Sequence, residues 1–142
     1  MIIRAAKGKD APALSALLAQ LGYPSTDASC RGKIKAYSKT GYKMLVAEAD
    51  KTIVGFISLH HYVTPHLPGP TGRITAFCMD EKSRGRGLGT LLLASGEQYF
   101  KEVGCYKIEV TSNLKRTRTH SYYLNLGYQQ TSMHFVKILK DR

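Results

Sequence analysis

The chain has 142 residues, of which 43% are hydrophobic and 22% charged, and it carries a net charge of +11. This length suits a single domain over residues 1–142, and this composition is that of a globular chain, which excludes a disordered protein. No apolar run reaches the length of a membrane span, and the first ten residues lack the apolar core of a signal peptide, so we expect a cytoplasmic protein without membrane contact.

The N-terminal third predicts one strand and two helices. Residues 2–5 are a short strand candidate. Asp10 begins a helix whose leucines recur at helical spacing until Gly22, with Pro12 tolerated in the first turn. A weaker helix is expected within residues 26–38.

The middle of the chain predicts three consecutive strands. Residues 42–49 and 52–61 flank the dipeptide Asp50-Lys51 and are predicted to form a tight β-hairpin. Proline and glycine residues mark 64–72 as a loop. A third strand is predicted at residues 73–79.

The C-terminal part predicts helices that alternate with strands. Leucines from Leu88 onward mark one face of a helix that Gly104 ends, and residues 107–111 alternate apolar and polar side chains as a strand does. A short helix is expected over residues 118–126. Two closing strands are predicted at 128–130 and 133–139. The order gives about seven strands and about four helices, which indicates a mixed α+β fold.

The stretch EKSRGRGLGTLLL, residues 81–93, lies between a predicted strand and a predicted helix. Glycines allow backbone N–H groups to point into one concavity, and a helix start adds more of them, so the stretch indicates an anion site. It lacks the Walker A pattern. It also fails the dinucleotide fingerprint, because Thr90 stands where a glycine is required. What remains is Arg84-x-x-Gly87-x-Gly89.

This hexapeptide resembles the acyl-CoA signature of the GNAT N-acetyltransferase superfamily. A second block, THSYYLNLGYQQ at residues 119–130, is similar to an aromatic-Tyr and Gly-Phe segment of that family. Tyr122-Tyr123 and Gly127-Tyr128 stand at the two matching positions, while Thr119 replaces the usual alanine. The resemblance implies a mostly antiparallel sheet in which one parallel pair splays apart.

The resemblance also implies how acetyl-CoA, the acyl donor, is bound. The donor would wedge between the strands at 73–79 and 107–111, with Phe77, Cys78 and Met79 pairing with the pantetheine arm. A backbone N–H near Phe77 would stabilise the oxyanion. The loop would hold the pyrophosphate through Arg84, Gly85, Arg86, Gly87, Leu88, Gly89 and Thr90. Asn113 would contact pantetheine, and Lys115, Arg116 or Arg118 would reach the remaining phosphate.

The reaction implied by the resemblance is direct attack of a primary amine on the thioester. Tyr123 would protonate the leaving thiolate, since tyrosine is ordinarily protonated at neutral pH. A general base is also required. Glu109 is the first candidate, with His60, His61 and Glu81 as alternatives.

Other interpretations remain open. The positive charge also suits a nucleic-acid-binding module, and a regulator that binds acyl-CoA without turnover is a third possibility. The histidine spacing fits no zinc pattern, so we expect no metal, and Cys78 is interpreted as a small buried residue. The sequence does not identify the acceptor amine, and it does not show whether the protein forms a homodimer. The resemblance implies that the acceptor pocket is formed by residues 14–39, 62–72 and 129–134, and these segments are poor in carboxylates, which disfavours a polycationic acceptor.

Overall fold

The computed structural model describes residues 1–112 and 116–141, which form two units, Met1–Val110 and Thr111–Arg142. The first unit contains one five-stranded sheet in the order β1-β2-β3-β4-β5. Its strands are β1 (Ile2–Ala5), β2 (Tyr42–Ala49), β3 (Thr52–Tyr62), β4 (Thr71–Met79) and β5 (Lys107–Val110). Asp50 and Lys51 both adopt positive φ, which makes the predicted tight turn between β2 and β3.

Strands β1 to β4 pair antiparallel, whereas β4 and β5 pair parallel, as predicted. The parallel register runs from Thr71 opposite Lys107 to Ile74 opposite Val110. Strand β4 continues to Met79, so its second half extends past the last β5 partner in the described chain. The backbone groups of β4 that face β5 therefore have no strand partner in the described chain after the two strands separate.

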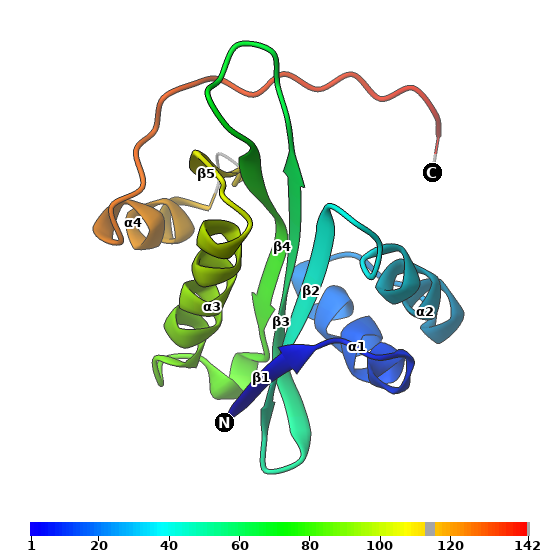
Figure 1. Ribbon diagram of the computed structural model, residues 1–142. Helices are drawn as coiled ribbons and strands as arrows, with labels where there is room; N and C mark the ends of the chain where they lie inside the picture. The colour runs from blue at the N-terminus through cyan, green and yellow to red at the C-terminus, as the bar shows by residue number, and fades with distance from the viewer. Residues whose placement is uncertain (113–115, 142) are drawn as a thin grey trace. The chain divides into compact units, whose positions relative to one another are not determined.

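Four α-helices are present in the described residues, and the three in the first unit cover both faces of its sheet. These three are α1 (Ala11–Leu21), α2 (Asp27–Ala36) and α3 (Leu88–Glu102). Helices α1 and α2 lie on one face and α3 on the other (Figure 1). The core under α1 and α2 is formed by Ala11, Leu14, Leu17, Cys30, Ile34, Met44, Val46, Phe56 and Cys78. No helix in residues 1–112 and 116–141 is long and apolar enough to cross a membrane.

Helix α3 approaches the sheet closely at glycines. A Cβ on Gly72 of β4 would lie 2.6 Å from Cδ1 of Phe100, and one on Gly96 would lie 3.2 Å from Cδ1 of Ile57. A larger residue at Gly72 would push the Phe100 ring away from β4. This contact fixes where α3 lies on the sheet.

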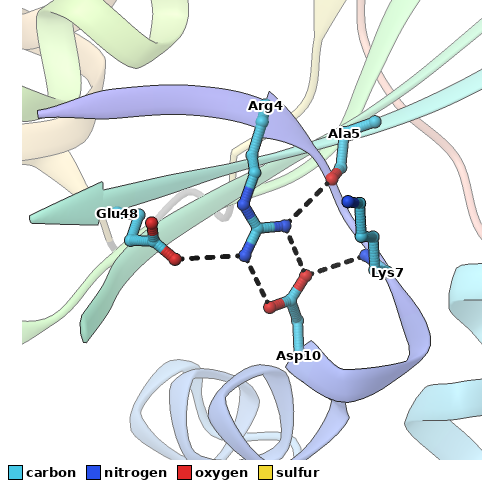
Figure 2. Close-up of polar contacts among 5 residues, drawn as sticks. All are labelled: Arg4, Ala5, Lys7, Asp10 and Glu48. Carbon is cyan, nitrogen blue, oxygen red and sulfur yellow. Dashed lines mark hydrogen bonds and ion pairs between the residues drawn. The ribbon is translucent and has the colours of Figure 1, made fainter. Parts of the chain in front are cut away.

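Asp10 stands immediately before α1, as predicted, but its side chain does not cap that helix. Oδ2 accepts hydrogen bonds from the Lys7 backbone N–H and Arg4 Nη1, both at 2.8 Å, and Oδ1 accepts one from Arg4 Nη2 at 2.9 Å. Arg4 Nη2 also lies 3.2 Å from Oε1 of Glu48 (Figure 2). The Arg4 guanidinium lowers the pKa of Asp10, and this network joins β1, β2 and the start of α1.

The second unit contains α4 (Thr117–Asn125), which corresponds to the predicted helix over 118–126. The two predicted closing strands are wrong, because residues 128–130 and 133–139 form no strand and the described sheet has five strands instead of seven. The large apolar side chains of the last segment are exposed, from 68% at Val136 to 86% at Leu139. Apolar content alone predicted these strands, but a strand also needs a partner for its backbone groups.

Candidate functional site

The glycine-rich loop follows the C-terminal end of β4. A short 3-10 helix, Glu81–Ser83, is held by Asp80, whose side chain accepts a hydrogen bond from the Lys82 backbone N–H at 3.1 Å. Gly85 and Gly87 then adopt φ values of +78° and +76°, in the left-handed region that favours glycine. A Cβ at either position would have no atom of the described chain within 4 Å, so the loop presents its backbone to open space.

Helix α3 begins at Leu88, directly after this loop, and its N-cap residue is Gly87, which has no side chain to cap the helix. The first amides of an α-helix have no acceptor within the helix and lie at the positive end of the helix dipole. Arg84 and Arg86 add two positive charges, and Arg84 Nε donates a hydrogen bond to the Met79 carbonyl at 3.2 Å. The structure thus brings residues 84–90 together at the C-terminal end of β4, and backbone amides and positive charge at such a place are the features that the predicted anion site requires.

The open edge of β4 leads from the loop toward β5. Cys78 is buried against the α1 core, and its Sγ lies 3.5 Å from the Leu17 carbonyl, as expected for a small packing residue. A Cβ on Gly89 would lie 3.2 Å from Cγ of Met79 and 3.5 Å from Cζ of Phe77. The start of α3 therefore sits close to the part of β4 that was predicted to bind the donor.

A β-bulge interrupts β4 near the point where β5 ends. Ser58 pairs with Ala76 and Leu59 with Ile74, which leaves Thr75 as an extra residue. Thr75 Oγ1 lies 2.7 Å from Oγ of Ser58 and 2.9 Å from the hydroxyl of Tyr37. Bulges are over-represented beside active sites, where they redirect side chains.

On the N-terminal side of the bulge in β4, polar and aromatic side chains form two rows across the sheet. These rows lie on the same face as α1 and α2, next to the part of that face that the two helices cover. Residues that are register partners on neighbouring strands share a face. The name polar platform is used here for Tyr42, His60, Arg73 and Glu109 in one row, and Tyr62, Thr71 and Lys107 in the next. The sequence did not reveal the platform, because its members come from four strands and only the register aligns them.

Aromatic rings stack along one side of the polar platform. The His60 ring lies between Tyr42 and Tyr62, with centroid separations of 4.2 Å and 5.3 Å. Nδ1 of His60 lies 2.9 Å from the Gly41 carbonyl oxygen. Since a carbonyl only accepts, this bond places the ring proton on Nδ1 and leaves the lone pair on Nε2 when the ring is neutral.

Glu109 lies at the other side of the polar platform, in an ionic cluster. Its Oε1 accepts hydrogen bonds from the Tyr62 hydroxyl at 2.5 Å and from Arg73 Nη1 at 3.1 Å, and its Oε2 lies 3.9 Å from Lys107 Nζ. Burial raises the pKa of the carboxyl, but the bonds from Tyr62 and Arg73 and the nearby positive charges outweigh burial and lower it. The same bond to Glu109 raises the pKa of Tyr62.

The other predicted base candidates lie elsewhere in the first unit. His61 follows His60 and points to the opposite face, where its Nδ1 lies 3.4 Å from the Tyr99 hydroxyl of α3. Glu81 lies in the 3-10 helix at the loop end of β4, where its backbone N–H donates to Oε1 of Gln20. Only His60 and Glu109 are brought together on one face.

Tyr123 lies on α4 in the second unit. Its ring contacts those of Tyr122 and Tyr128, with centroid separations of 5.6 Å and 5.3 Å. Burial, with a smaller contribution from Tyr122, raises the pKa of Tyr123 to about 12. Arg118 is exposed on the same helix, and Asn113 and Lys115 lie outside the described residues.

Two curated proteins are similar to part of the chain. An aminoalkylphosphonate N-acetyltransferase of Salmonella typhimurium is 34% identical over 87 residues, which cover 61% of this chain and 56% of that protein. An aminoglycoside N(6')-acetyltransferase type 1 of Stenotrophomonas maltophilia is 26% identical over 94 residues, which cover 64% of this chain and 61% of that protein. The chain thus matches less than two thirds of the length of these relatives.

A solved structure and a family model extend the likeness over most of the chain. The crystal structure of a GNAT family acetyltransferase from Staphylococcus aureus has the same fold, with a TM-score of 0.82 at 24% identity over 97% of this chain and 98% of that one. The model of the Acetyltransferase (GNAT) family matches residues 14–128. The chain therefore belongs to the GNAT family of acetyltransferases.

Proposed function

We propose that this protein transfers an acetyl group from acetyl-CoA to a primary amine. The proposal rests mainly on the loop before α3, in which Gly85 and Gly87 adopt positive φ. This loop follows the part of β4 that has no β5 partner in the described chain. The loop suits the pyrophosphate of acetyl-CoA, and the adjoining edge of β4 suits the arm that contains amide groups. Family membership supports the same assignment.

The donor is bound mainly by backbone groups in this proposal. Amides of residues 84–90 hold the pyrophosphate, with Arg84 and Arg86 supplying charge. Backbone groups of Phe77, Cys78 and Met79 pair with the pantetheine amides as a neighbouring strand would. Asn113 and Arg118 keep the roles that the resemblance implies, at the pantetheine arm and the adenosine phosphate.

The chemistry is acyl transfer through a tetrahedral intermediate. The neutral amine attacks the thioester carbon, a C–N bond forms, and the oxyanion is stabilised by a backbone N–H near Phe77. Collapse breaks the C–S bond and releases the CoA thiolate. We assign Tyr123 as the proton donor to that thiolate. Its pKa of about 12 keeps the hydroxyl protonated at neutral pH, so it has a proton to donate. Because it is a weak acid, it donates this proton while the C–S bond breaks and negative charge develops on the sulfur.

The proton that the attacking amine loses requires a base, and we assign His60 ahead of Glu109. The bond to Gly41 leaves the basic lone pair on Nε2 of His60. Glu109 has a lowered pKa and two hydrogen bonds to one oxygen, which make its carboxylate a weak base. Glu109 then serves to position Arg73 and Tyr62.

The proposed activity is tested by thiol release from acetyl-CoA in the presence of a panel of amines, with mass spectrometry of the products. We expect release that depends on an amine and an acetylated amine as the product. Salt-sensitive binding to DNA that acetyl-CoA leaves unchanged, without thiol release, would favour the nucleic-acid alternative instead. Acetyl-CoA binding without release from any amine would favour a non-catalytic regulator.

A further inference from the structure

The acceptor class is a separate question, because the two curated relatives are named for different acceptors, an aminoalkylphosphonate and an aminoglycoside. We propose that the acceptor of this protein is a small amine that also carries an anionic group, and that Arg73 and Lys107 of the polar platform bind this anion. The inference rests on the proposed acetyl transfer and specifies its second substrate.

The polar platform lies at the correct end of the proposed donor site. The anion site follows Met79, at the C-terminal end of β4, so a donor bound along the open edge runs from there back toward the bulge at Thr75. The last pair of β4 and β5 is Ile74 with Val110. Arg73 and Glu109, one residue earlier on each strand, are the first platform side chains that the reactive end of the donor would meet.

The charges of the polar platform favour an anion. Arg73 and Lys107 carry two positive charges, and Glu109 is the one carboxylate among the seven platform residues. The flanking helix α2 is also basic, with Arg31, Lys33 and Lys35 following one carboxylate, Asp27, in its first turn. A second ammonium group on the acceptor would be repelled here, whereas a carboxylate, phosphonate or phosphate would be attracted.

A buried hydroxyl on β4, that of Thr71, provides an additional polar group in the second row of the polar platform. Thr71 is 1% exposed, and its Oγ1 has no hydrogen-bond partner in the described part of the chain. In the register it lies between Tyr62 and Lys107 on the same face. A buried hydroxyl without a partner is costly, and an anion oxygen that accepts its hydrogen bond would remove that cost.

The rest of the platform sets the size of the acceptor. The rings of Tyr42, His60 and Tyr62 stack on one another, and their edges form an aromatic wall against which a short alkyl chain can pack. The Tyr37 hydroxyl, bonded to Thr75 at 2.9 Å, connects the end of α2 to the sheet beside these rings. The surface between them suits a compact acceptor whose amine and anion are a few bonds apart.

The test uses four amines that share the group H₂N–CH₂–CH₂– and differ only in the group at the other end. These are aminoethylphosphonate, β-alanine, propylamine and diaminopropane, which end in a phosphonate, a carboxylate, a methyl group and a methylammonium group. We expect kcat/KM for at least one of the two anionic amines to exceed that for propylamine about tenfold or more, and diaminopropane to be the poorest acceptor. The two anionic amines distinguish a tetrahedral anion from a planar one.

Two lysine variants then locate the anion. Lys107→Gln removes a platform charge, and Lys101→Gln removes an exposed charge on α3 as a matched control. We expect the ratio of kcat/KM for the preferred anionic amine to that for propylamine to fall about tenfold in Lys107→Gln and to remain at the wild-type value in Lys101→Gln. Lys107→Glu should move the preference toward diaminopropane. The wild-type ratio should also fall as salt is added.

Equal kcat/KM for anionic and neutral amines, or a preference for diaminopropane, would overturn the inference while leaving acetyl transfer in place. An anionic preference that Lys107→Gln and Arg73→Gln both leave unchanged would also overturn it, because the anion would then be bound elsewhere. Absence of thiol release with every amine would count against the proposed function itself, and with it against this inference.

Discussion

The Tyr62 hydroxyl donates a hydrogen bond to Oε1 of Glu109 across the strand that separates them, over a distance of 2.5 Å. Arg73 of the intervening β4 donates to the same oxygen at 3.1 Å. Three strands are therefore joined by one carboxylate oxygen, at the place where β4 and β5 part. This cluster positions the platform side chains that we assign to the acceptor.

Replacing Tyr62 by Phe removes this hydroxyl while keeping the ring that stacks on His60. We expect KM for the acceptor to rise severalfold, because Glu109 and Arg73 lose a positioning hydrogen bond, while the Kd for acetyl-CoA stays near the wild-type value. Tyr106→Phe, at an exposed tyrosine before β5, is the control. An acceptor KM equal to that of wild type would remove the cluster from acceptor binding.

The kinetic constants of two variants separate His60 from Glu109 as the base. Loss of a general base lowers kcat, whereas loss of a positioning residue mainly raises the KM for the acceptor. We expect His60→Gln to lower kcat about 100-fold, and Glu109→Gln to raise the acceptor KM with a smaller effect on kcat. His66→Gln, in an exposed loop, is the control. A larger loss of kcat in Glu109→Gln than in His60→Gln would restore Glu109 as the base.

Tyr123→Phe tests the proton donor. General acid catalysis typically contributes a factor of about 100 or more, so kcat should fall about 100-fold, with the Kd for acetyl-CoA changed little. Tyr122→Phe, at the adjacent ring, should retain most of the activity. A kcat within a factor of two of wild type in Tyr123→Phe would exclude this hydroxyl from the chemistry.

Asp10→Asn tests the network in Figure 2 through stability. We expect the free energy of unfolding at neutral pH to fall by about 2 kcal/mol, because the Arg4 guanidinium loses one of its two ionised partners and keeps only Glu48. The folded protein lowers the pKa of Asp10 below its ordinary value of 3.8, so this stabilisation is present above that pH and is lost as the pH falls through the folded pKa.

Urea unfolding of wild type and Asp10→Asn at neutral pH, and again below pH 3.8, provides the measurement. The difference between the two proteins should shrink at the lower pH. Asp27→Asn, at the exposed start of α2, should show a smaller difference at neutral pH. A difference for Asp10→Asn that persists at low pH would mean that its charge is not what stabilises the fold.

The strand and helix order of the first unit could be predicted because each element is specified locally. Leucine spacing marks α1, and the glycines before Leu88 need left-handed backbone that a helix interior would not permit. The C-terminal strands could not be predicted reliably, because apolar residues such as Phe135 and Ile138 do not reveal whether a partner strand is present.

The loop half of the candidate site could be predicted, whereas the polar platform could not. Residues 84–90 are contiguous, so their pattern is visible in the sequence. Tyr62, Arg73 and Glu109 come from three strands, and the bulge at Thr75 shifts the register that aligns Arg73 with His60. Strand periodicity gives the face of a residue only within its own strand, so this alignment needed the structure.

The binding of acetyl-CoA to two glutamate variants tests the central claim most directly. Gly87 and Gly104 both have positive φ and open space around a Cβ, so Gly87→Glu and Gly104→Glu carry similar backbone strain at opposite ends of α3. Calorimetric titration should show that Gly87→Glu abolishes acetyl-CoA binding, through the bulk and negative charge placed at the pyrophosphate, while Gly104→Glu binds as wild type does. Equal affinity in the two variants would contradict the assignment of the loop, and with it the acetyltransferase account.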